Sequence, residues 1–336
     1  MTVRLPLPSL TALLGPALPD VLTACRRHSG LITRTERVYG GNVSHVFRVR
    51  GEHASVILKI RTDRFAGMPA LHTDPTLIDD ERRALEVYRR AAPSVFPHVL
   101  GFHADAHAMI LTDVFPDGRS YQQHLDERPA TIEEVARLGK TLRRVHHATQ
   151  DTNTTFRSHS EEWFREHSFG FCLRATDHTV LRRACEELAA VPRQQLVLGD
   201  LAPKNLSLAA DGVAICDLDN VHRGWPLYDV AYFLAHLLLH HLGQAEHVPR
   251  LVYALLTAYL TAPSPQRPAR ADMLLMATVI AGVVLYRLDE TVPYPLPVPA
   301  ALTGRFRERV LRLLDTGACT LQDLVRAAGA PSKAAA

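Results

Sequence analysis

Hydrophobic and polar positions alternate through much of the first third of the chain, as they do in β-strands. Two alternating runs flank GGN at 40–42, a turn signal, and together they predict a β-hairpin. In ASVILKI, Val56, Leu58 and Ile60 share one face of a strand. Lys59 therefore lies in mid-strand on the opposite face. The predicted strands of this region are residues 31–39, 44–50, 54–60, 99–104 and 107–113.

The pattern changes to a helical period in TLIDDERRALEVYRR, residues 76–90. Glu81, Leu85 and Tyr88 stand at positions i, i+4 and i+7, so the carboxylate of Glu81 shares the apolar stripe and points inward. Glu86 stands among arginines on the opposite, solvated face. This run therefore predicts an amphipathic helix with one inward-facing acid.

Beyond residue 115 the chain is mainly helical. Pro116 and Gly118 break the strand pattern, and we expect a lobe boundary there. A capping box of Thr131 and Glu134 predicts a helix start, and residues 227–240 are apolar on nearly every face, which is typical of a buried helix. We expect an α+β fold, with an N-terminal antiparallel β-sheet lobe containing one helix and a larger, mainly helical C-terminal lobe. The predicted ranges are 1–113 for the first lobe, 114–330 for the second and 331–336 for a frayed tail.

Composition adds little about partners. Hydrophobic residues make up 47% of the 336 positions and charged residues 22%, which is ordinary for a globular protein. The net charge of +3, from 38 basic and 35 acidic residues, gives no strong field for a nucleic acid or a membrane surface. The longest apolar run, Met273–Tyr286, is shorter than the ~20 residues that cross a bilayer, so it favours a buried helix.

The cysteines and the first residues favour a cytoplasmic protein. Five scattered cysteines without a CxxC pair indicate neither a disulfide framework nor a zinc site. The start of the sequence is broken by prolines and lacks the apolar segment and cleavage site of a signal peptide. We expect a reducing compartment, with no nucleic-acid or membrane partner.

Acidic side chains concentrate in LVLGDLAPKNLSLAADGVAICDLDN, residues 196–220. The segment predicts a strand, a tight turn and a hairpin that reverses at AADG. Asn205 and Asp217 stand at the two open ends of that hairpin, where antiparallel pairing brings opposed Cα atoms about 5 Å apart. Their oxygens suit Mg²⁺, which takes few protein ligands together with substrate phosphates. Asp219 projects to the same side as Asp217, and Asp200 lies in the turn before the hairpin.

GDLAPKN followed by DLD resembles the His-Gly-Asp-x-x-x-x-Asn and Asp-x-Glu/Asp pattern of the aminoglycoside phosphotransferase, choline kinase and methylthioribose kinase superfamily. GGNVSHVF resembles the short phosphate loop of that superfamily, VILK its nucleotide-lysine strand, and ERRAL the helix that partners the lysine. GWPLYDVAYFLAHLL looks like the segment that follows the motif in methylthioribose kinases. The resemblance runs in order along residues 38–240 and implies a bilobal protein-kinase-like fold, ATP as co-substrate and Mg²⁺ as cofactor.

The resemblance also implies a role for each motif residue. Asp200 would be the catalytic base that accepts or orients the proton of the acceptor hydroxyl. Lys59, held by Glu81, would pair with the α- and β-phosphates. The metal ligands would be Asn205, Asp217 and, as a candidate further ligand, Asp219. The remaining nucleotide contacts would come from the phosphate loop and from the backbone beside the adenine: Gly40, Gly41, Asn42, Thr112, Asp113 and Val114.

Two positions depart from the superfamily pattern. Leu198 stands where the superfamily has His before Gly-Asp, so the support that this His gives to the catalytic loop is missing. Ala202 stands where relatives carry Lys or His, and Lys204 is a candidate replacement contact to the γ-phosphate. Asp229 could cap the buried helix that follows, but we favour support of the catalytic loop. Candidate acceptor contacts are Arg223 and Trp225, although surface charge and core packing explain them equally well.

We therefore expect an enzyme that transfers the γ-phosphate of ATP, with GTP as an open alternative, to a hydroxyl group of a small molecule. Residues 221–336 hold 8 acidic and 11 Lys or Arg residues, and this balance disfavours a polycationic aminoglycoside. The acceptors that remain are a sugar, a nucleoside, an amino alcohol or an antibiotic-like natural product, which suggests a role in antibiotic resistance or natural-product modification. We expect a monomer or a homodimer.

Two other classes compete with this prediction. A protein kinase is disfavoured because Asp217 is followed by Leu and Asp rather than by the Phe-Gly of a protein-kinase DFG motif. A catalytically silent nucleotide-binding pseudokinase, acting as a binding or sensor module, is the alternative, and Leu198 and Ala202 favour it.

Histidine pairs in the second lobe have simpler explanations than metal binding. His236 and His240 share a helix face, but Leu237 replaces the Glu of a zinc-protease helix, so core or rim histidines are favoured. Surface positions at helix ends are expected for the pairs His146–His147 and His240–His241.

Overall fold

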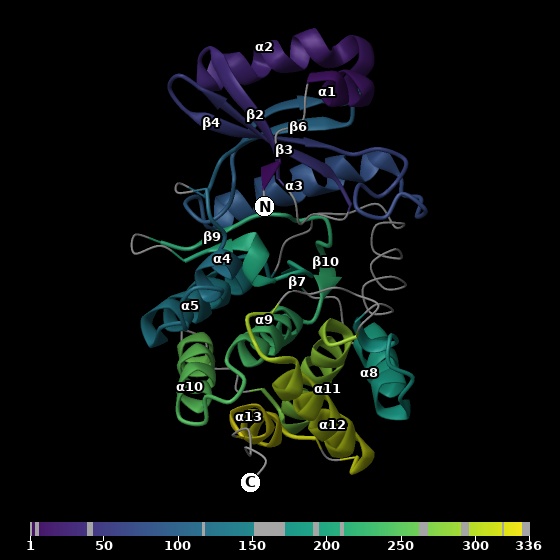
Figure 1. Cartoon of the computed structure of the whole chain (residues 1–336), viewed down its shortest axis with the longest axis vertical. Coiled ribbons are helices and arrows are strands. Elements are labelled where there is room, and N and C mark those ends of the chain that lie inside the picture. The colour runs from purple at the N-terminus through teal and green to yellow at the C-terminus, as the bar shows by residue number, and fades with distance from the viewer. Residues whose placement is uncertain are drawn as a thin grey trace. The chain divides into compact units, whose positions relative to one another are not determined.

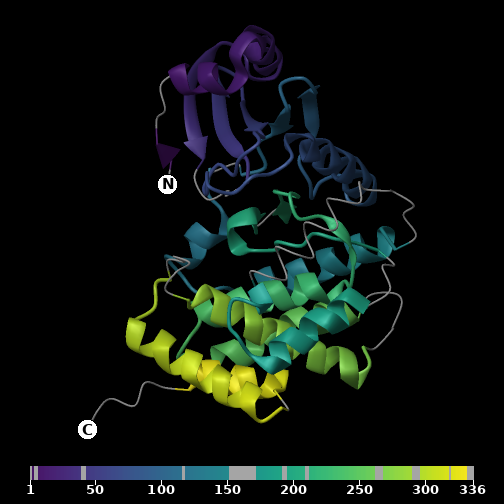
Figure 2. The ribbon, with the colours of Figure 1, turned by 90° about the vertical axis from the view of Figure 1, so that its right-hand side faces the viewer.

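The chain forms two compact units, and the first of them includes a short segment from the later part of the sequence. The first unit is Met1–Gly118 with Ala214–Asp219, and the second is Arg119–Val213 with Asn220–Ala336. Figures 1 and 2 show the elements of both units in a computed structural model. The structure describes residues 2–3, 7–38, 43–115, 118–150, 172–190, 195–208, 212–261, 268–289, 296–317 and 319–330. The predicted turns at Gly40–Asn42 and Ala209–Asp211, Pro116, and the predicted tail 331–336 lie outside these residues.

An antiparallel sheet forms the centre of the first unit. Its strand order in the described residues is β1-β2-β3-β4-β6-β5, and every neighbouring pair is antiparallel. Strands β2 to β6 coincide with the predicted runs, so the predicted sheet is confirmed. The strands are β1 (Thr2–Val3), β2 (Ile32–Val38), β3 (His45–Gly51), β4 (Ser55–Ile60), β5 (Val99–His103) and β6 (Ala108–Thr112); the short β9 (Ala214–Ile215) also belongs to this unit.

Helices lie on both faces of this sheet, and successive side chains of β4 point to opposite faces. Leu58 and Ile60 pack in one buried cluster with Val21 and Cys25 of α2 (Leu18–Ser29), together with residues of α1 (Leu7–Leu14). The helices α1 and α2 lie together against the strands in Figure 1. Lys59 projects from the opposite face, toward α3 (Ile78–Ala91). The predicted helix at 76–90 is thus confirmed, preceded by the 3-10 turn η2 (Pro75–Leu77).

The sequence prediction of one helix in this lobe was wrong, because α1, α2 and α3 all belong to the first unit. Prolines interrupt the sequence pattern near the N-terminus, so the helices α1 and α2 were not predicted there. Pro16 lies in the first turn of η1 (Gly15–Ala17), and Pro19 lies in the first turn of α2. Proline is tolerated in a first turn because the amide that it lacks has no helical partner there.

The second unit is mainly helical, as predicted. Thr131 and Glu134 form the predicted capping box at the start of α5. All residues of α9 are buried, and the long apolar run lies in α11 with its centre buried, so both predicted core helices are confirmed. None of the described helices combines the length and hydropathy that a membrane crossing requires. The helices are α4 (Tyr121–Leu125), α5 (Ile132–Ala148), α8 (Thr179–Ala190), α9 (Leu227–His240), α10 (His247–Leu260), α11 (Arg270–Arg287), α12 (Ala300–Asp315) and α13 (Leu321–Gly329).

Short strands carry the acidic motif in the second unit. β7 (Gln195–Val197) pairs antiparallel with β10 (His222–Gly224). The 3-10 turn η4 (Pro203–Asn205) follows β7 and leads directly into β8 (Leu206–Ser207). Asp200 and Asn205 therefore lie in the second unit, whereas Asp217 and Asp219 follow β9 in the first unit.

Candidate active site

The lysine on β4 forms the ion pair that the sequence predicted. The Nζ atom of Lys59 lies 2.8 Å from Oε1 and 2.8 Å from Oε2 of Glu81 on α3. Both residues are buried, with exposed fractions of 3% and 2%. Oε1 of Glu81 also accepts a hydrogen bond from the backbone amide of Leu218 at 3.1 Å. Glu81 thus holds the lysine and the segment that follows β9.

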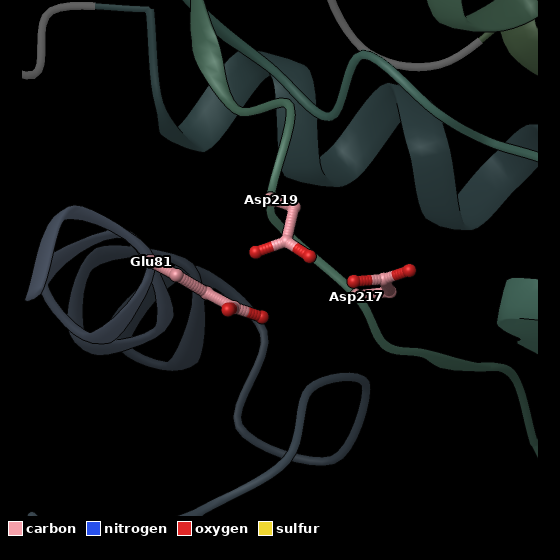
Figure 3. A group of neighbouring side chains, drawn as sticks. All are labelled: Glu81, Asp217 and Asp219. Carbon is pink, nitrogen blue, oxygen red and sulfur yellow. The ribbon is translucent and has the colours of Figure 1, made fainter. Parts of the chain in front are cut away.

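Two further carboxylates converge on the same lysine. The Nζ atom of Lys59 lies 2.7 Å from Oδ1 of Asp217 and 3.1 Å from Oδ2 of Asp219. Figure 3 shows the side chains of Glu81, Asp217 and Asp219 pointing toward one another, the first from α3 and the others from the segment after β9. One carboxylate oxygen from each lies within 4.8 Å of the others. Asp217 and Asp219 therefore project to the same side, as predicted.

Arg61 and Ser44 also contact this cluster, and neither was predicted from the sequence. The Nη1 atom of Arg61 lies 3.4 Å from Oδ1 of Asp219, and the hydroxyl of Ser44 lies 3.4 Å from Oδ2 of the same carboxylate. Arg61 stands two positions after Lys59, and this spacing along an extended chain was the signal that could have revealed it.

The backbone at Asp217 is in the left-handed region, with φ of +65°. Few residues other than glycine adopt this conformation, although Asp and Asn tolerate it better than most. Such conformations occur preferentially at functional sites. The side chain of Asp217 is 22% exposed and that of Asp219 is 8% exposed, so Asp217 is the more open of the two carboxylates.

Burial and charge oppose each other in this cluster. Burial by itself lowers the pKa of Lys59, but the charges of Asp217, Asp219 and Glu81 raise it well above its ordinary value. Burial raises the pKa of Glu81 to about 8, against the opposing effect of the Lys59 ammonium group. Lys59 therefore carries a positive charge at neutral pH and neutralises part of the acidic cluster.

The donor set of the cluster fits a divalent cation with oxygen ligands. Asp217 and Asp219 offer carboxylate oxygens, which hard cations such as Mg²⁺ prefer. Because the pKa of Glu81 is raised to about 8, its carboxyl is mostly protonated at neutral pH, and the carboxylates of Asp217 and Asp219 balance the charges of Lys59 and Arg61. Asp217, the more open of the two carboxylates, is the better placed to bind such a cation.

The end of β6, which is predicted to lie against the adenine, is held by hydrogen bonds to the carboxylate of Asp113. The Asp113 carboxylate accepts hydrogen bonds from Nε of Arg48 at 2.6 Å and from Nη2 of the same residue at 3.2 Å. It also accepts from the hydroxyl of Ser55 at 2.7 Å and from the backbone amide of Phe115 at 3.2 Å. The side chain of Asp113 is therefore engaged by the protein itself, and the neighbouring backbone is fixed.

In the second unit, Asp200 is positioned by the residues of η4. The side-chain amide of Asn205 donates to the backbone carbonyl of Asp200 at 2.9 Å and to its Oδ2 at 3.1 Å. The Nζ atom of Lys204 lies 3.4 Å from the same Oδ2. The other oxygen, Oδ1, is buried and has no hydrogen-bond partner among the described residues. Buried polar atoms without a partner are costly, so this oxygen is a candidate for accepting a proton from a substrate.

Asp229 supports the loop that carries Asp200, as the sequence analysis favoured. Its carboxylate accepts hydrogen bonds from the backbone amides of Leu198 and Gly199, both at 2.8 Å. Nε2 of His146 lies 3.0 Å from the same carboxylate, and Nδ1 of His146 lies 2.9 Å from the hydroxyl of Tyr259. The loop therefore has a buried support although the superfamily's His is replaced by Leu198.

The expected surface positions of three histidines were wrong. His146, His240 and His241 are buried, with exposed fractions of 1%, 6% and 0%. A polar contact stabilises each of these positions, such as the backbone amide of Ala130, which donates to Nε2 of His241 at 2.9 Å. His147 is exposed as expected, and His236 is buried in α9 as a core residue.

The other predicted contacts stay predictions. Trp225 is mostly buried and Arg223 lies on β10, opposite Leu196. Gly40, Gly41 and Asn42 lie outside the described residues. The pairing of Asn205 with Asp217 also remains a prediction.

Known proteins resemble this chain in sequence pattern and in fold. The sequence profile of the phosphotransferase enzyme family matches residues 35–273. A search of curated protein sequences gives no match. Among solved structures, the amicoumacin kinase hAmiN in complex with AMP-PNP and Ca²⁺ shares 16% identity and a TM-score of 0.61, over 94% of this chain and 97% of that chain.

Two further structures resemble the chain over most of their own length. A choline/ethanolamine kinase family protein from Mesorhizobium loti shares 18% identity and a TM-score of 0.53, over 96% of this chain and 98% of that chain. The aminoglycoside phosphotransferase APH(3'')-Id from Streptomyces rimosus shares 17% identity and a TM-score of 0.52, over 79% of this chain and 98% of that chain. At these identities the likeness is one of fold, and the fold is the kinase-like fold of these enzymes.

Proposed function

The chain belongs to the phosphotransferase enzyme family, and we propose that its motif residues divide the work of phosphoryl transfer as the family pattern assigns it. The protein is a small-molecule kinase that uses ATP. The observation that carries the assignment of residues is the contact of Lys59 with both Glu81 and Asp217. This contact joins the nucleotide lysine, its partner helix and the metal-motif acid in one cluster.

Lys59 pairs with the α- and β-phosphates of the nucleotide. Its ammonium group is buried and charged, and Glu81 holds it from the side of α3. A positive charge held in a buried site stabilises the charge of the phosphates with little reorganisation of solvent. Gly40 to Asn42, which lie outside the described residues, keep the phosphate-loop role of the family pattern, and the backbone of Thr112 to Val114 lies against the adenine. The engaged side chain of Asp113 supports this assignment, because it leaves backbone groups as the contacts.

Asn205 and Asp217 would hold Mg²⁺, with Asp219 as the candidate further ligand. Bound there, the ion would supply positive charge against the charge of the nucleotide phosphates. The open side chain and left-handed backbone of Asp217 support its role as the principal acid. Asn205 donates to the carboxylate of Asp200 through its amide nitrogen, and the amide oxygen is the atom of such a side chain that ligates a metal ion.

Asp200 accepts the proton of the acceptor hydroxyl. Its Oδ2 is oriented by Asn205 and Lys204, which leaves the buried Oδ1 for the incoming hydroxyl. Asp229 holds the backbone immediately before Asp200 and thereby fixes the base in position. In phosphoryl transfer, positioning of the attacking hydroxyl contributes a large part of the rate enhancement. Lys204 also remains a candidate contact to the γ-phosphate.

The acceptor is a neutral or anionic alcohol. The slight basic excess of residues 221–336 supports this class over a polycation. A sugar, a nucleoside or an antibiotic-like natural product fits this class. Arg223 and Trp225 are candidate acceptor contacts. The enzyme works in the cytoplasm as a monomer or a homodimer.

The test is phosphorylation of a metabolite extract with ATP and Mg²⁺, followed by mass spectrometry for the gain of one phosphoryl group. The wild type should produce new phosphorylated species, and Asp200→Asn should produce none. Asp177→Asn, at an exposed acid of the same unit, is the matched control and should behave as the wild type. Binding of ATP without a product from any extract would instead support the silent nucleotide-binding module.

A further inference from the structure

Arg61 contacts the acidic cluster through Asp219 but has no role in the proposed function. It directly follows β4, and its backbone amide donates to the carbonyl of His107 at 3.0 Å, so the chain is still extended there. Lys59 and Arg61 therefore project to the same side. Both side chains are buried. Two cationic side chains, one on β4 and one directly after it, thus face the acidic cluster.

Asp219 is less exposed than Asp217 and has protein contacts at both of its oxygens, whereas Lys59 lies 2.7 Å from Oδ1 of Asp217. Arg61 occupies Oδ1 of Asp219 at 3.4 Å, and Lys59 and Ser44 occupy Oδ2 at 3.1 Å and 3.4 Å. Each oxygen of Asp219 therefore already has a donor from the protein, in a side chain that is 8% exposed. Lys59 can leave Asp219 for a phosphate, because a flexible ammonium exchanges partners readily. Arg61 is held more firmly.

Arg61 is fixed by a second contact. Its Nη2 atom donates to the hydroxyl of Thr73 at 2.9 Å, while Nη1 faces Asp219. An arginine stays charged in any protein environment, so this charge is permanent. Its Nε is buried and has no hydrogen-bond partner among the described residues, which costs stability. Stability alone therefore does not explain an arginine at this position.

We propose that Arg61 is a built-in cation that takes the place of a second metal ion at Asp219, so that the enzyme works with a single divalent ion, held at Asp217. This inference rests on the proposed function. A second divalent ion at Asp219 would have to displace the guanidinium group or lie within a few ångströms of its charge, and like charges at that separation repel strongly where water is excluded. Asp219, the candidate further metal ligand of the proposed function, then holds Arg61 and Lys59 in the site instead of a metal ion.

The test counts metal ions with Mn²⁺ as the probe. Full-length protein is saturated with the ATP analogue AMP-PNP, and bound Mn²⁺ and bound nucleotide are measured by equilibrium dialysis. The wild type should bind one Mn²⁺ per nucleotide. Arg61→Met removes the charge at similar length and should bind two, and the second ion should disappear again in Arg61→Met combined with Asp219→Asn. Arg61→Lys keeps the charge and should bind one.

Two single variants test the same assignment without the loss of Arg61. Asp219→Asn should change the affinity for Mn²⁺ by less than about threefold, whereas Asp217→Asn should weaken it about tenfold or more, as expected for loss of a metal ligand. Circular dichroism of each variant checks that it is folded. If Arg61→Met does not fold, two results still test the proposal: the ratio of bound Mn²⁺ to bound nucleotide in the wild type, and the difference in Mn²⁺ affinity between Asp217→Asn and Asp219→Asn.

The outcomes separate the inference from the proposed function. Two Mn²⁺ per nucleotide in the wild type, one in folded Arg61→Met, or equal losses in Asp217→Asn and Asp219→Asn would overturn the role of Arg61 and leave the kinase assignment standing. Failure of the wild type to bind AMP-PNP with Mn²⁺ would overturn the proposed function, and the inference with it.

Discussion

The carboxylate of Asp229 accepts a hydrogen bond from the backbone amide of Gly199 at 2.8 Å. These residues are 30 positions apart, and the bond fixes the backbone immediately before the proposed base, Asp200. A second bond from the amide of Leu198 and the contact with His146 make this support buried and polar. In this chain, the support of the loop thus comes from the first turn of α9.

Asp229→Asn should lower kcat about 100-fold, because it replaces one accepting oxygen by an amide group that faces a backbone amide and so displaces the loop. It should also lower the free energy of unfolding by about 2–3 kcal/mol. ADP formation and urea unfolding measure the two effects. Asp315→Asn, at an exposed acid of the same unit, should change neither by more than about 0.5 kcal/mol. Wild-type kcat in Asp229→Asn would contradict the role of the loop support.

Lys59→Met should reduce kcat/KM for ATP by about 100-fold to 1000-fold, since a buried charge that faces the phosphates is lost. Glu81→Gln should give a smaller loss of the same kind, because the lysine remains but one of the two oxygens that face its ammonium group is replaced by an amide nitrogen, which cannot accept a hydrogen bond. Initial rates at varied ATP concentration measure both. Lys140→Met, on the exposed face of α5, is the control and should leave the kinetics unchanged. Equal kinetics for Lys59→Met and Lys140→Met would remove Lys59 from the nucleotide site.

Asp113→Ala should destabilise the protein by about 3 kcal/mol, because it leaves the buried guanidinium group of Arg48 without its partner. We also expect a higher KM for ATP, since the backbone at the end of β6 is no longer held in place. Thermal unfolding and ATP titration check the two effects. Asp105→Ala, at an exposed turn of the same unit, should leave both values within error of the wild type. A stable Asp113→Ala protein would show that Arg48 finds another partner.

Stability should fall at mildly acidic pH because of His240 and His241. Burial lowers the pKa of each imidazole to about 4, below its ordinary value of 6.5, with a further contribution from neighbouring histidines. Nε2 of His241 accepts a hydrogen bond from the amide of Ala130 and Nδ1 donates to the carbonyl of Leu237, so protonation of Nε2 would break a buried bond.

The sign follows from proton binding. Between pH 6.5 and 4 the unfolded chain binds protons that the folded protein excludes, so the stabilisation is complete above pH 6.5 and is lost as the pH falls. Each histidine should remove about 2 kcal/mol of the free energy of unfolding between pH 7 and pH 5. Urea unfolding at both pH values measures this loss. His241→Gln should be less sensitive to pH than the wild type, whereas His147→Gln, at an exposed site, should retain the full dependence.

The sequence by itself determined the local elements and the order of the motifs. Alternation over five or six residues is enough to place Lys59 on the face of β4 opposite Leu58, and helical spacing is enough to turn Glu81 inward on α3. These patterns act over a few residues, and their physical cause, burial of one face, is written in the sequence. Their ion pair could therefore be predicted from the two elements and the family resemblance.

Only the tertiary structure decided which charged groups, distant from one another in the sequence, lie in contact. Lys59 and Asp217 are 158 positions apart, and so are Arg61 and Asp219. No periodicity relates residues at such separations; their contact depends on how the whole chain packs. For the same reason His146 was expected at the surface, although its partners Asp229 and Tyr259 make it a buried residue. A polar side chain is buried where the fold supplies a partner, and the sequence around it does not contain that partner.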